Sequence, residues 1–196
     1  AVGAHYADIV TWDLLAKSFD AYQKLDFSKR RFQTSVWEHS HATAAIVLTV
    51  ISIESYRNIL CRLEKRKIGK RDVGVVKDLC GILTKKDNAF PTDRFEEMLT
   101  EVFVLRDVIV HSHLYEVRVC FQKTAMLSHR QRRLEGYGDK KFEQCVNSHT
   151  RKTRMLKLNV QPAKIGFEDL FKVLVILDLL VGVTQKLVGC RLLNWL

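Results

Sequence analysis

The chain has 196 residues, of which 47% are hydrophobic, and its formal net charge is +10. A hydrophobic fraction of this size is enough to bury a core, so it excludes an intrinsically disordered chain. The excess of positive charge favours a polyanionic partner, either nucleic acid or, less often, an anionic membrane surface; the alternative is a basic surface that only keeps the protein in solution. The chain holds only two prolines and nine glycines, which favours long helices over a sheet with many turns.

The cysteines do not follow the pattern of a disulfide framework. Their number is odd, their spacings are wide, and no C-x-x-C motif occurs among Cys61, Cys80, Cys120, Cys145 and Cys190. The first residues carry no basic stretch followed by an apolar run, so we expect no signal peptide and a reducing, cytoplasmic location. No His or Cys pair has a second pair at zinc spacing, and no phosphate-binding glycine loop occurs, so we expect neither a metal nor a cofactor.

Four helices are expected in the first 111 residues. The first covers residues 8–24, where apolar residues recur at spacings of three and four: Ile9, Trp12, Leu15, Ala16, Phe19 and Tyr22. The second, residues 35–63, has the strongest pattern, an apolar stripe of Ala42, Ala45, Ile46, Thr49, Val50, Ile53, Tyr56 and Leu60. The third covers residues 72–83. The fourth begins near Thr92 and runs towards His111, with one apolar face formed by Phe95, Leu99, Val102 and Ile109.

Strand periodicity replaces helical periodicity after the fourth helix. Residues 115–121 alternate strictly, and residues 156–160 alternate in the same way. We expect these two segments to pair as a small antiparallel ribbon.

The last expected helix, residues 167–187, is continuously hydrophobic and should be central to the core. Its most apolar stretch, Val173 to Val183, has 11 residues, whereas a membrane-spanning helix needs about 20 apolar residues, so we expect a buried helix and no membrane insertion. The expected fold class is mainly α: an antiparallel helical bundle formed by residues 1–113 and 166–196, with a basic β-ribbon inserted as residues 114–165.

The fourth helix contains the most informative local anomaly. Its three-four series of apolar residues places position 106 on the apolar face, but that position is Arg106. A buried arginine is costly unless it is paired or faces a cleft or an interface. His111 follows five residues later. Together the two groups have the chemistry to cleave a phosphodiester without a metal, because an imidazole accepts the proton of a 2′-hydroxyl and a guanidinium stabilises the charge of the transition state.

This Arg-x4-His spacing, with the polar Asp107 directly after the arginine and near the end of a late helix, resembles the motif of the HEPN domain family. The segment Ile51 to Leu60 is similar to the second long helix of that family. The resemblance covers residues 35–113 and the last helix, whereas residues 114–165 depart from the family pattern. It implies that Arg106, Asp107 and His111 form a metal-independent ribonuclease site of the kind found in toxin–antitoxin and antiviral-defence systems. Other members of the family are catalytically silent binding modules.

Two alternatives stay open for Arg106. It either belongs to an active site or forms a buried salt bridge, with Glu54 as the candidate partner, while His111 caps the helix. A five-residue step on a regular helix separates two side chains by about 140°. Both groups therefore reach one phosphate only if the helix ends near Val110 or if two chains juxtapose their motifs. In the HEPN family two such helices meet at the active site, which implies a symmetric homodimer.

The segment from Arg118 to Lys157 is a basic arm, with eleven Lys and Arg residues against three acids and a net charge of +8. Such a segment suits binding to a phosphate backbone; the alternative is a solvated loop. The candidate substrate-binding residues are those of its densest parts: Arg130, Arg132, Arg133, Lys140, Lys141, Arg151, Lys152 and Arg154.

From the sequence we expect an endoribonuclease that cleaves RNA by attack of the 2′-hydroxyl and acts as a homodimer, with an antitoxin or a larger complex as a further partner. The alternative is a non-catalytic module that binds RNA or protein. A DNA-binding regulator is a third possibility, favoured only by the charge.

Overall fold

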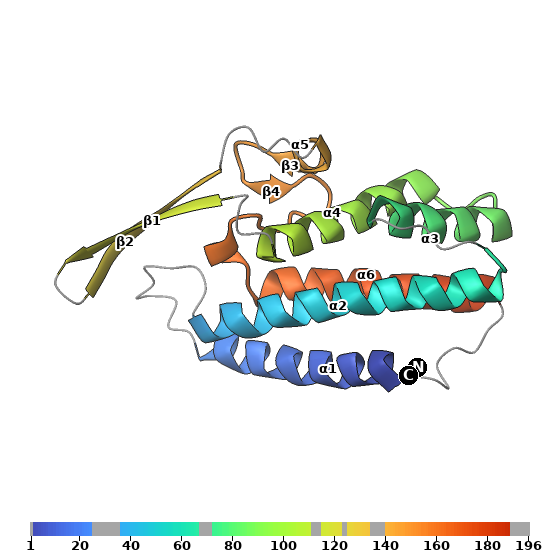
Figure 1. The fold of residues 1–196 in the computed structure, drawn as a ribbon, viewed down its shortest axis with the longest axis horizontal. Helices are drawn as coiled ribbons and strands as arrows, with labels where there is room; N and C mark the ends of the chain where they lie inside the picture. The colour runs from blue at the N-terminus through green and yellow to red at the C-terminus, as the bar shows by residue number, and fades with distance from the viewer. Residues whose placement is uncertain are drawn as a thin grey trace.

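The computed structural model describes residues 2–24, 36–66, 72–110, 115–122, 125–133 and 140–188. Its mainly helical architecture, with small antiparallel strand pairs, confirms the expected fold class (Figure 1). The helices are α1 (Val2–Gln23), α2 (Val36–Leu63), α3 (Asp72–Lys86), α4 (Thr92–Val110), the short α5 (Lys140–Cys145) and α6 (Phe167–Val188), which follows a 3₁₀ turn at Pro162–Lys164. The strands are β1 (Tyr115–Gln122), β2 (Ala125–Arg133), β3 (Val146–Asn147) and β4 (Lys152–Thr153).

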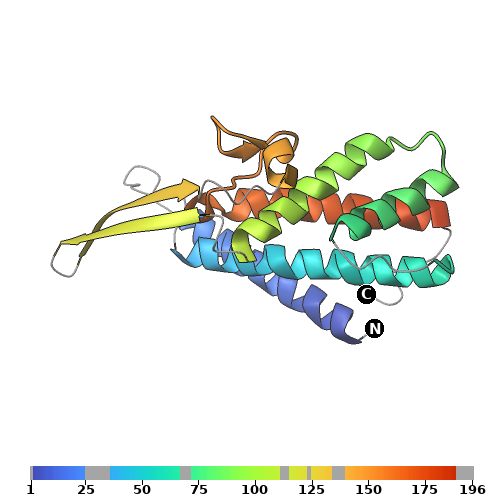
Figure 2. The ribbon, with the colours of Figure 1, turned by 45° about the horizontal axis from the view of Figure 1, so that its top comes forward.

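The long helices lie in three layers (Figures 1 and 2). α2 and α6 lie side by side in the middle, α1 packs on one side of α2, and α3 and α4 pack on the other side. α1 and α4 run antiparallel to α2, whereas α6 runs in the same direction as α2. The two central helices begin at the same end of the bundle, where the Glu38 carboxylate accepts a hydrogen bond of 3.0 Å from the backbone N–H of Phe167.

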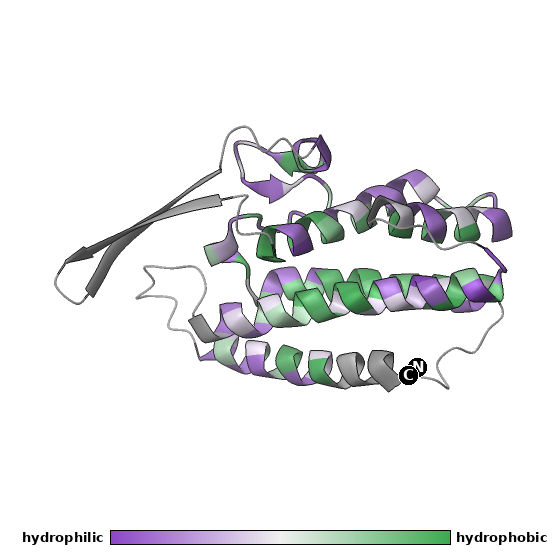
Figure 3. Ribbon diagram, viewed as in Figure 1, coloured by the Kyte–Doolittle hydropathy of each residue, from purple (hydrophilic) through white to green (hydrophobic). Residues whose placement is uncertain are grey.

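The apolar stripe predicted on α2 is the centre of the core. All eight of its residues are buried, so the prediction is confirmed. Hydrophobic residues of α4 and α6 accompany those of α2 in the middle of the bundle (Figure 3). The segment Glu38–Leu63 is also long and apolar enough to cross a membrane, but 50% of its most apolar window is buried inside the bundle, as in the central helix of a packed core.

The buried face of α1 differs from the apolar stripe that predicted this helix. Trp12 is 59% exposed and Phe19 is 40% exposed, whereas Thr11 and Ser18 are buried. Ser18 donates a hydrogen bond of 3.4 Å to the backbone carbonyl of Glu38. Small side chains on this face let α1 approach α2 closely, and the large aromatic residues are left on its flank, where the ring of Phe19 lies 5.1 Å from that of Phe167.

α6 is central to the core on one face only. Its buried hydrophobic residues are Leu170, Val173, Ile176 and Leu180, while Phe171, Val175 and Leu179 are exposed. The predicted place of this helix in the core is therefore confirmed for one face, and its continuous hydrophobicity extends onto an exposed face.

The predicted pairing of residues 115–121 with residues 156–160 is wrong. β1 pairs instead with β2 in an antiparallel ribbon, from Tyr115 opposite Arg133 to Gln122 opposite Ala125. Only two residues separate these strands, so their pairing closes a much shorter loop than a pairing with residues 156–160 would. The second alternating segment, residues 156–160, is not a strand: the φ of Lys157 is 56°, and a single antiparallel bridge joins Asn159 to Lys152 of β4.

The predicted insertion, residues 114–165, divides into two parts. The β1–β2 ribbon extends beyond the end of the bundle (Figures 1 and 2). Residues 140–165 instead pack on the bundle, with Phe142, Val146, Leu158, Val160 and Ile165 buried. The buried Glu101 of α4 holds this second part, because its carboxylate accepts hydrogen bonds of 2.7 Å and 2.8 Å from the backbone N–H groups of Met155 and Leu156.

Candidate functional site

Arg106 lies on the face of α4 that the sequence pattern predicted. The preceding members of the series, Leu99 and Val102, are fully buried, and the Arg106 side chain is only 17% exposed. Its guanidinium carbon lies 5.7 Å from the centre of the Phe103 ring, one turn earlier on α4. A cation this far out of water requires partners, and the surrounding structure supplies them.

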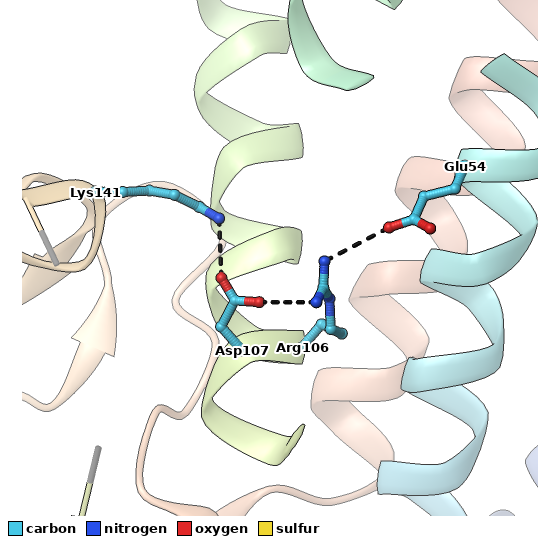
Figure 4. Close-up of polar contacts among 4 residues, drawn as sticks. All are labelled: Glu54, Arg106, Asp107 and Lys141. Carbon is cyan, nitrogen blue, oxygen red and sulfur yellow. Dashed lines mark hydrogen bonds and ion pairs between the residues drawn. The ribbon is translucent and has the colours of Figure 1, made fainter. Parts of the chain in front are cut away.

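Two carboxylates lie beside the Arg106 guanidinium (Figure 4). Its Nη2 lies 3.5 Å from Oε1 of Glu54 on α2, and its Nη1 lies 3.2 Å from Oδ1 of Asp107, the next residue on α4. The other oxygen of Asp107, Oδ2, lies 3.0 Å from Nζ of Lys141 on α5. The four side chains form a continuous chain of ion pairs that ties α2, α4 and α5 together. The predicted pairing of Arg106 with Glu54 is thus present.

Phe103 lies beneath both cations of this cluster. Nζ of Lys141 is 5.8 Å from the centre of the ring, close to the corresponding distance for Arg106. The ring face attracts cations, so it helps to hold both groups where they are. Sequence analysis missed this role of Phe103. The available signal was its position three residues before Arg106, where the two side chains lie on one side of a helix.

The cluster is electrically neutral, with two carboxylates and two cations. Asp107 and Lys141 are 14% and 18% exposed, whereas the Glu54 side chain is 35% exposed. The contact between Arg106 and Glu54 is the longest of the three ion pairs and has the most exposed partner. An incoming anion would therefore compete most readily with Glu54 for the guanidinium, while Asp107 and Phe103 keep it oriented.

His111 lies outside the described residues. α4 is described as far as Val110, which is 50% exposed, so the histidine follows the last described residue of this helix. Of the three predicted catalytic residues, the structure brings Arg106 and Asp107 together, whereas for His111 only its place in the sequence, directly after Val110, is given.

The predicted substrate-binding residues fall in two regions. Arg130, Arg132 and Arg133 lie on β2, where the backbone is described and the side chains are not. The others belong to the part that packs on the bundle. Lys140 and Arg154 are exposed, Arg151 and Lys152 are half-buried, and Lys141 is engaged with Asp107.

Within the ranges that the structure describes, no three His, Cys, Asp or Glu side chains are grouped as ligands of a metal ion would be. Comparison of the chain with protein-family models, with curated proteins and with solved structures finds no match. The candidate site therefore depends on the residues and geometry of this chain alone.

Proposed function

We propose that this protein is a metal-independent endoribonuclease of the HEPN type that acts on RNA in the cytoplasm. The observation that carries the proposal is the oriented, largely buried Arg106 on the last turns of α4, just before His111 and the basic ribbon in the chain. Nothing in helix packing alone favours an arginine in the middle of an apolar stripe.

In the proposed reaction, the neutral imidazole of His111 accepts the proton of a 2′-hydroxyl. The resulting oxygen attacks the adjacent phosphorus, and the bond between phosphorus and the 5′-oxygen breaks. The 5′-oxygen takes a proton from water, the products are a 2′,3′-cyclic phosphate and a 5′-hydroxyl, and the His111 imidazolium returns its proton to the solvent. Arg106 donates hydrogen bonds to the non-bridging oxygens as charge builds up on them. Asp107 acts as a positioning residue, since it holds the guanidinium at 3.2 Å before substrate arrives.

The ion pairs around Arg106 support a catalytic role in one respect. A guanidinium that is already oriented loses little conformational entropy when phosphate binds, and preorganised charge stabilises a transition state better than charge that must reorganise. We infer that phosphate displaces Glu54 from Nη2, because that contact is 3.5 Å long and partly exposed to water.

The test is cleavage of a fluorescent single-stranded RNA in excess EDTA by the wild type and by three variants. Arg106→Ala and His111→Ala should each lose at least about 100-fold in rate at saturating RNA. Glu54→Gln should keep kcat and lower KM, because the competing carboxylate is removed. Wild-type rates in both Arg106→Ala and His111→Ala would contradict the proposal.

A second candidate function is a non-catalytic RNA-binding module, and one observation favours it. Arg106 already has two carboxylate partners within the chain, as a purely structural arginine would. For that function Glu54→Gln and Arg106→Ala should both lower the melting temperature, and the wild type should bind RNA without cutting it. Cleavage of bound RNA by the wild type therefore separates the two candidates, and the effect of Glu54→Gln on KM is informative only if cleavage occurs.

We also propose that the active form is a homodimer in which α4 of each chain faces the other. The exposed Val110 and the nearby Arg106 would then contribute to a shared groove. Sedimentation of a fully active monomer at nanomolar concentration would exclude this arrangement. An antitoxin or a larger complex is the class of partner expected to control such an activity.

A further inference from the structure

The register of the β1–β2 ribbon divides its arginines between two faces. Arg118 is the cross-strand partner of Arg130, and Glu116 is the partner of Arg132. These four positions share one face, because residues two apart on a strand lie on the same side of a sheet. Arg133, opposite Tyr115, belongs to the other face, so we no longer count it with Arg130 and Arg132 among the substrate-binding residues. We call the face with Arg118, Arg130 and Arg132 the arginine face.

The Arg118–Arg130 pair is unfavourable for the ribbon by itself. Like charges directly opposite each other on neighbouring strands destabilise their pairing, whereas opposite charges such as Glu116 and Arg132 stabilise it. An isolated two-stranded ribbon is only marginally stable in water. Two arginines at opposite register positions near the middle of such a ribbon are therefore best explained by binding of an anion there.

The position of this pair along the chain points to RNA as the source of that anion. Tyr115 and Arg133 form the rung nearest to α4, and the Arg118–Arg130 rung lies three residues further along β1. At a rise of about 3.3 Å per residue, that is about 10 Å from the base of the ribbon. A strand of RNA bound along the arginine face would run towards the end of α4, the helix that carries Arg106.

We propose that the arginine face binds one strand of RNA and that Arg118 and Arg130 share a single backbone phosphate. This inference rests on the proposed function, since it places the substrate of that site. A guanidinium binds phosphate oxygens through two parallel hydrogen bonds, and arginines at opposite register positions of one face are close enough along the ribbon to bind one phosphate together. The opposite face, with Tyr115, Val117 and Val119 along β1, carries no such pair.

The ribbon itself supplies a matched control. Arg130→Gln and Arg133→Gln remove the same charge from the same strand, but from opposite faces. We would measure binding of a single-stranded oligoribonucleotide to the full chain in EDTA, at several salt concentrations and in a His111→Ala background. Arg130→Gln should weaken binding by about tenfold and reduce the log–log salt slope by about 0.7, whereas Arg133→Gln should change affinity less than about twofold.

A double-mutant cycle tests the shared phosphate. If both arginines hold the same group, Arg118→Gln combined with Arg130→Gln should lose less affinity than the product of the two single losses. Without RNA, either single change should slow hydrogen–deuterium exchange of the β1 and β2 amides, because the like-charge repulsion is removed. Faster exchange in either single variant would mean that the pair stabilises the ribbon, and it would overturn the proposal.

Other outcomes also decide the matter. Equal losses of RNA affinity for Arg130→Gln and Arg133→Gln would contradict the proposal, because they would show that binding depends on net charge and not on one face. Multiplicative losses of affinity in the cycle would contradict the shared phosphate. Binding to vesicles containing anionic lipid, with no face-dependent binding to RNA, would assign the ribbon to a membrane surface. Cleavage is measured separately, without the His111 change. Face-specific binding without any cleavage would contradict the ribonuclease proposal alone. Cleavage without face-specific binding would contradict only the proposal that the arginine face binds RNA.

Discussion

The arginine on α4 and the arginines on the ribbon are placed by opposite rules. Arg106 sits among acids and an aromatic ring, and its cluster is electrically neutral. Arg118 lies opposite Arg130, so the central rung of the ribbon concentrates positive charge. Removing one partner of a partly buried ion pair costs stability, whereas like charges at opposite register positions cost stability until a partner arrives. The two regions therefore differ in whether an arginine has acidic partners within its own fold, as Arg106 has, or stands at a register position opposite another cation, as Arg118 does.

The largest effect that would sharpen this comparison is expected from two histidines: His111, which follows α4 in the sequence, and His129 on β2. His111→Ala should lower the cleavage rate at saturating RNA by about 100-fold or more, because the proposed base is lost. His129→Ala, on β2 opposite Val119, removes the same group from the ribbon and should leave that rate unchanged. Initial rates in EDTA measure both, and an active His111→Ala variant would show that the base lies elsewhere.

The next effect is on folding stability. Arg106→Met should destabilise the protein by about 1–2 kcal/mol, since it leaves Glu54 and Asp107 without their common cation in a partly buried place. Arg118→Met removes an arginine from the ribbon and should change the free energy of unfolding by less than about 0.5 kcal/mol. Urea unfolding followed by circular dichroism compares the two. Equal losses in the free energy of unfolding would contradict the proposed difference between the arginine of α4 and those of the ribbon.

A smaller effect is expected from the exposed basic residues of the part that packs on the bundle. Lys140 and Arg154 are exposed on the part that packs beside α4. If both contact RNA phosphates, replacing both with Gln should reduce the log–log salt slope by about 1.4. The matched pair Lys77→Gln and Lys85→Gln, exposed on α3, should leave the slope unchanged. A slope that responds equally to both pairs would indicate binding through net charge alone.

The smallest effect concerns an ion pair that belongs to the bundle. Lys86 on α3 lies 2.9 Å from Glu64, and this hydrogen bond lowers the pKa of the Glu64 carboxyl below its usual 4.5. The folded-state pKa is depressed, so the pair contributes stability above pH 4.5, and that stability is lost as the pH falls through the lower folded-state value. Glu64→Gln should cost less than about 1 kcal/mol at pH 7, because Lys86 is partly exposed. This loss of unfolding free energy should vanish at acid pH, where Glu64 is protonated. A loss that persists there would show that Glu64 contributes through packing and not through its charge.

Much of the bundle could be predicted from the sequence because its helices have a clear periodicity. The α2 stripe, the apolar face of α4 and the unusual position of Arg106 all follow from spacings of three and four. Glu54 could be named as a partner because the apolar stripes of α2 and α4 must face a common core and Arg106 requires an acid. These are properties that each helix displays by itself.

The features that could not be predicted depend on contacts between distant segments. β2 carries no apolar alternation, so nothing in its residues indicates a strand; it is one because β1 lies two residues away. The ion pair of Lys141 with Asp107 joins residues 34 positions apart and has no local signal. The exposed flank of α1, with Trp12 and Phe19, arises because small residues allow closer packing on α2, which periodicity does not measure.

The parallel arrangement of α2 and α6 has a consequence for how the chain folds. The hydrogen bonds that join their beginnings, from Phe167 to Glu38 and between His39 and Ile165, span 129 and 126 positions. The core is complete only when α6, which is far from α2 in the sequence, packs against α2. Contacts between segments so far apart in the sequence slow folding. During synthesis α2 is made long before α6, and until α6 follows, the apolar stripe of α2 is only partly covered. We therefore expect a chaperone to bind the chain before α6 packs on α2.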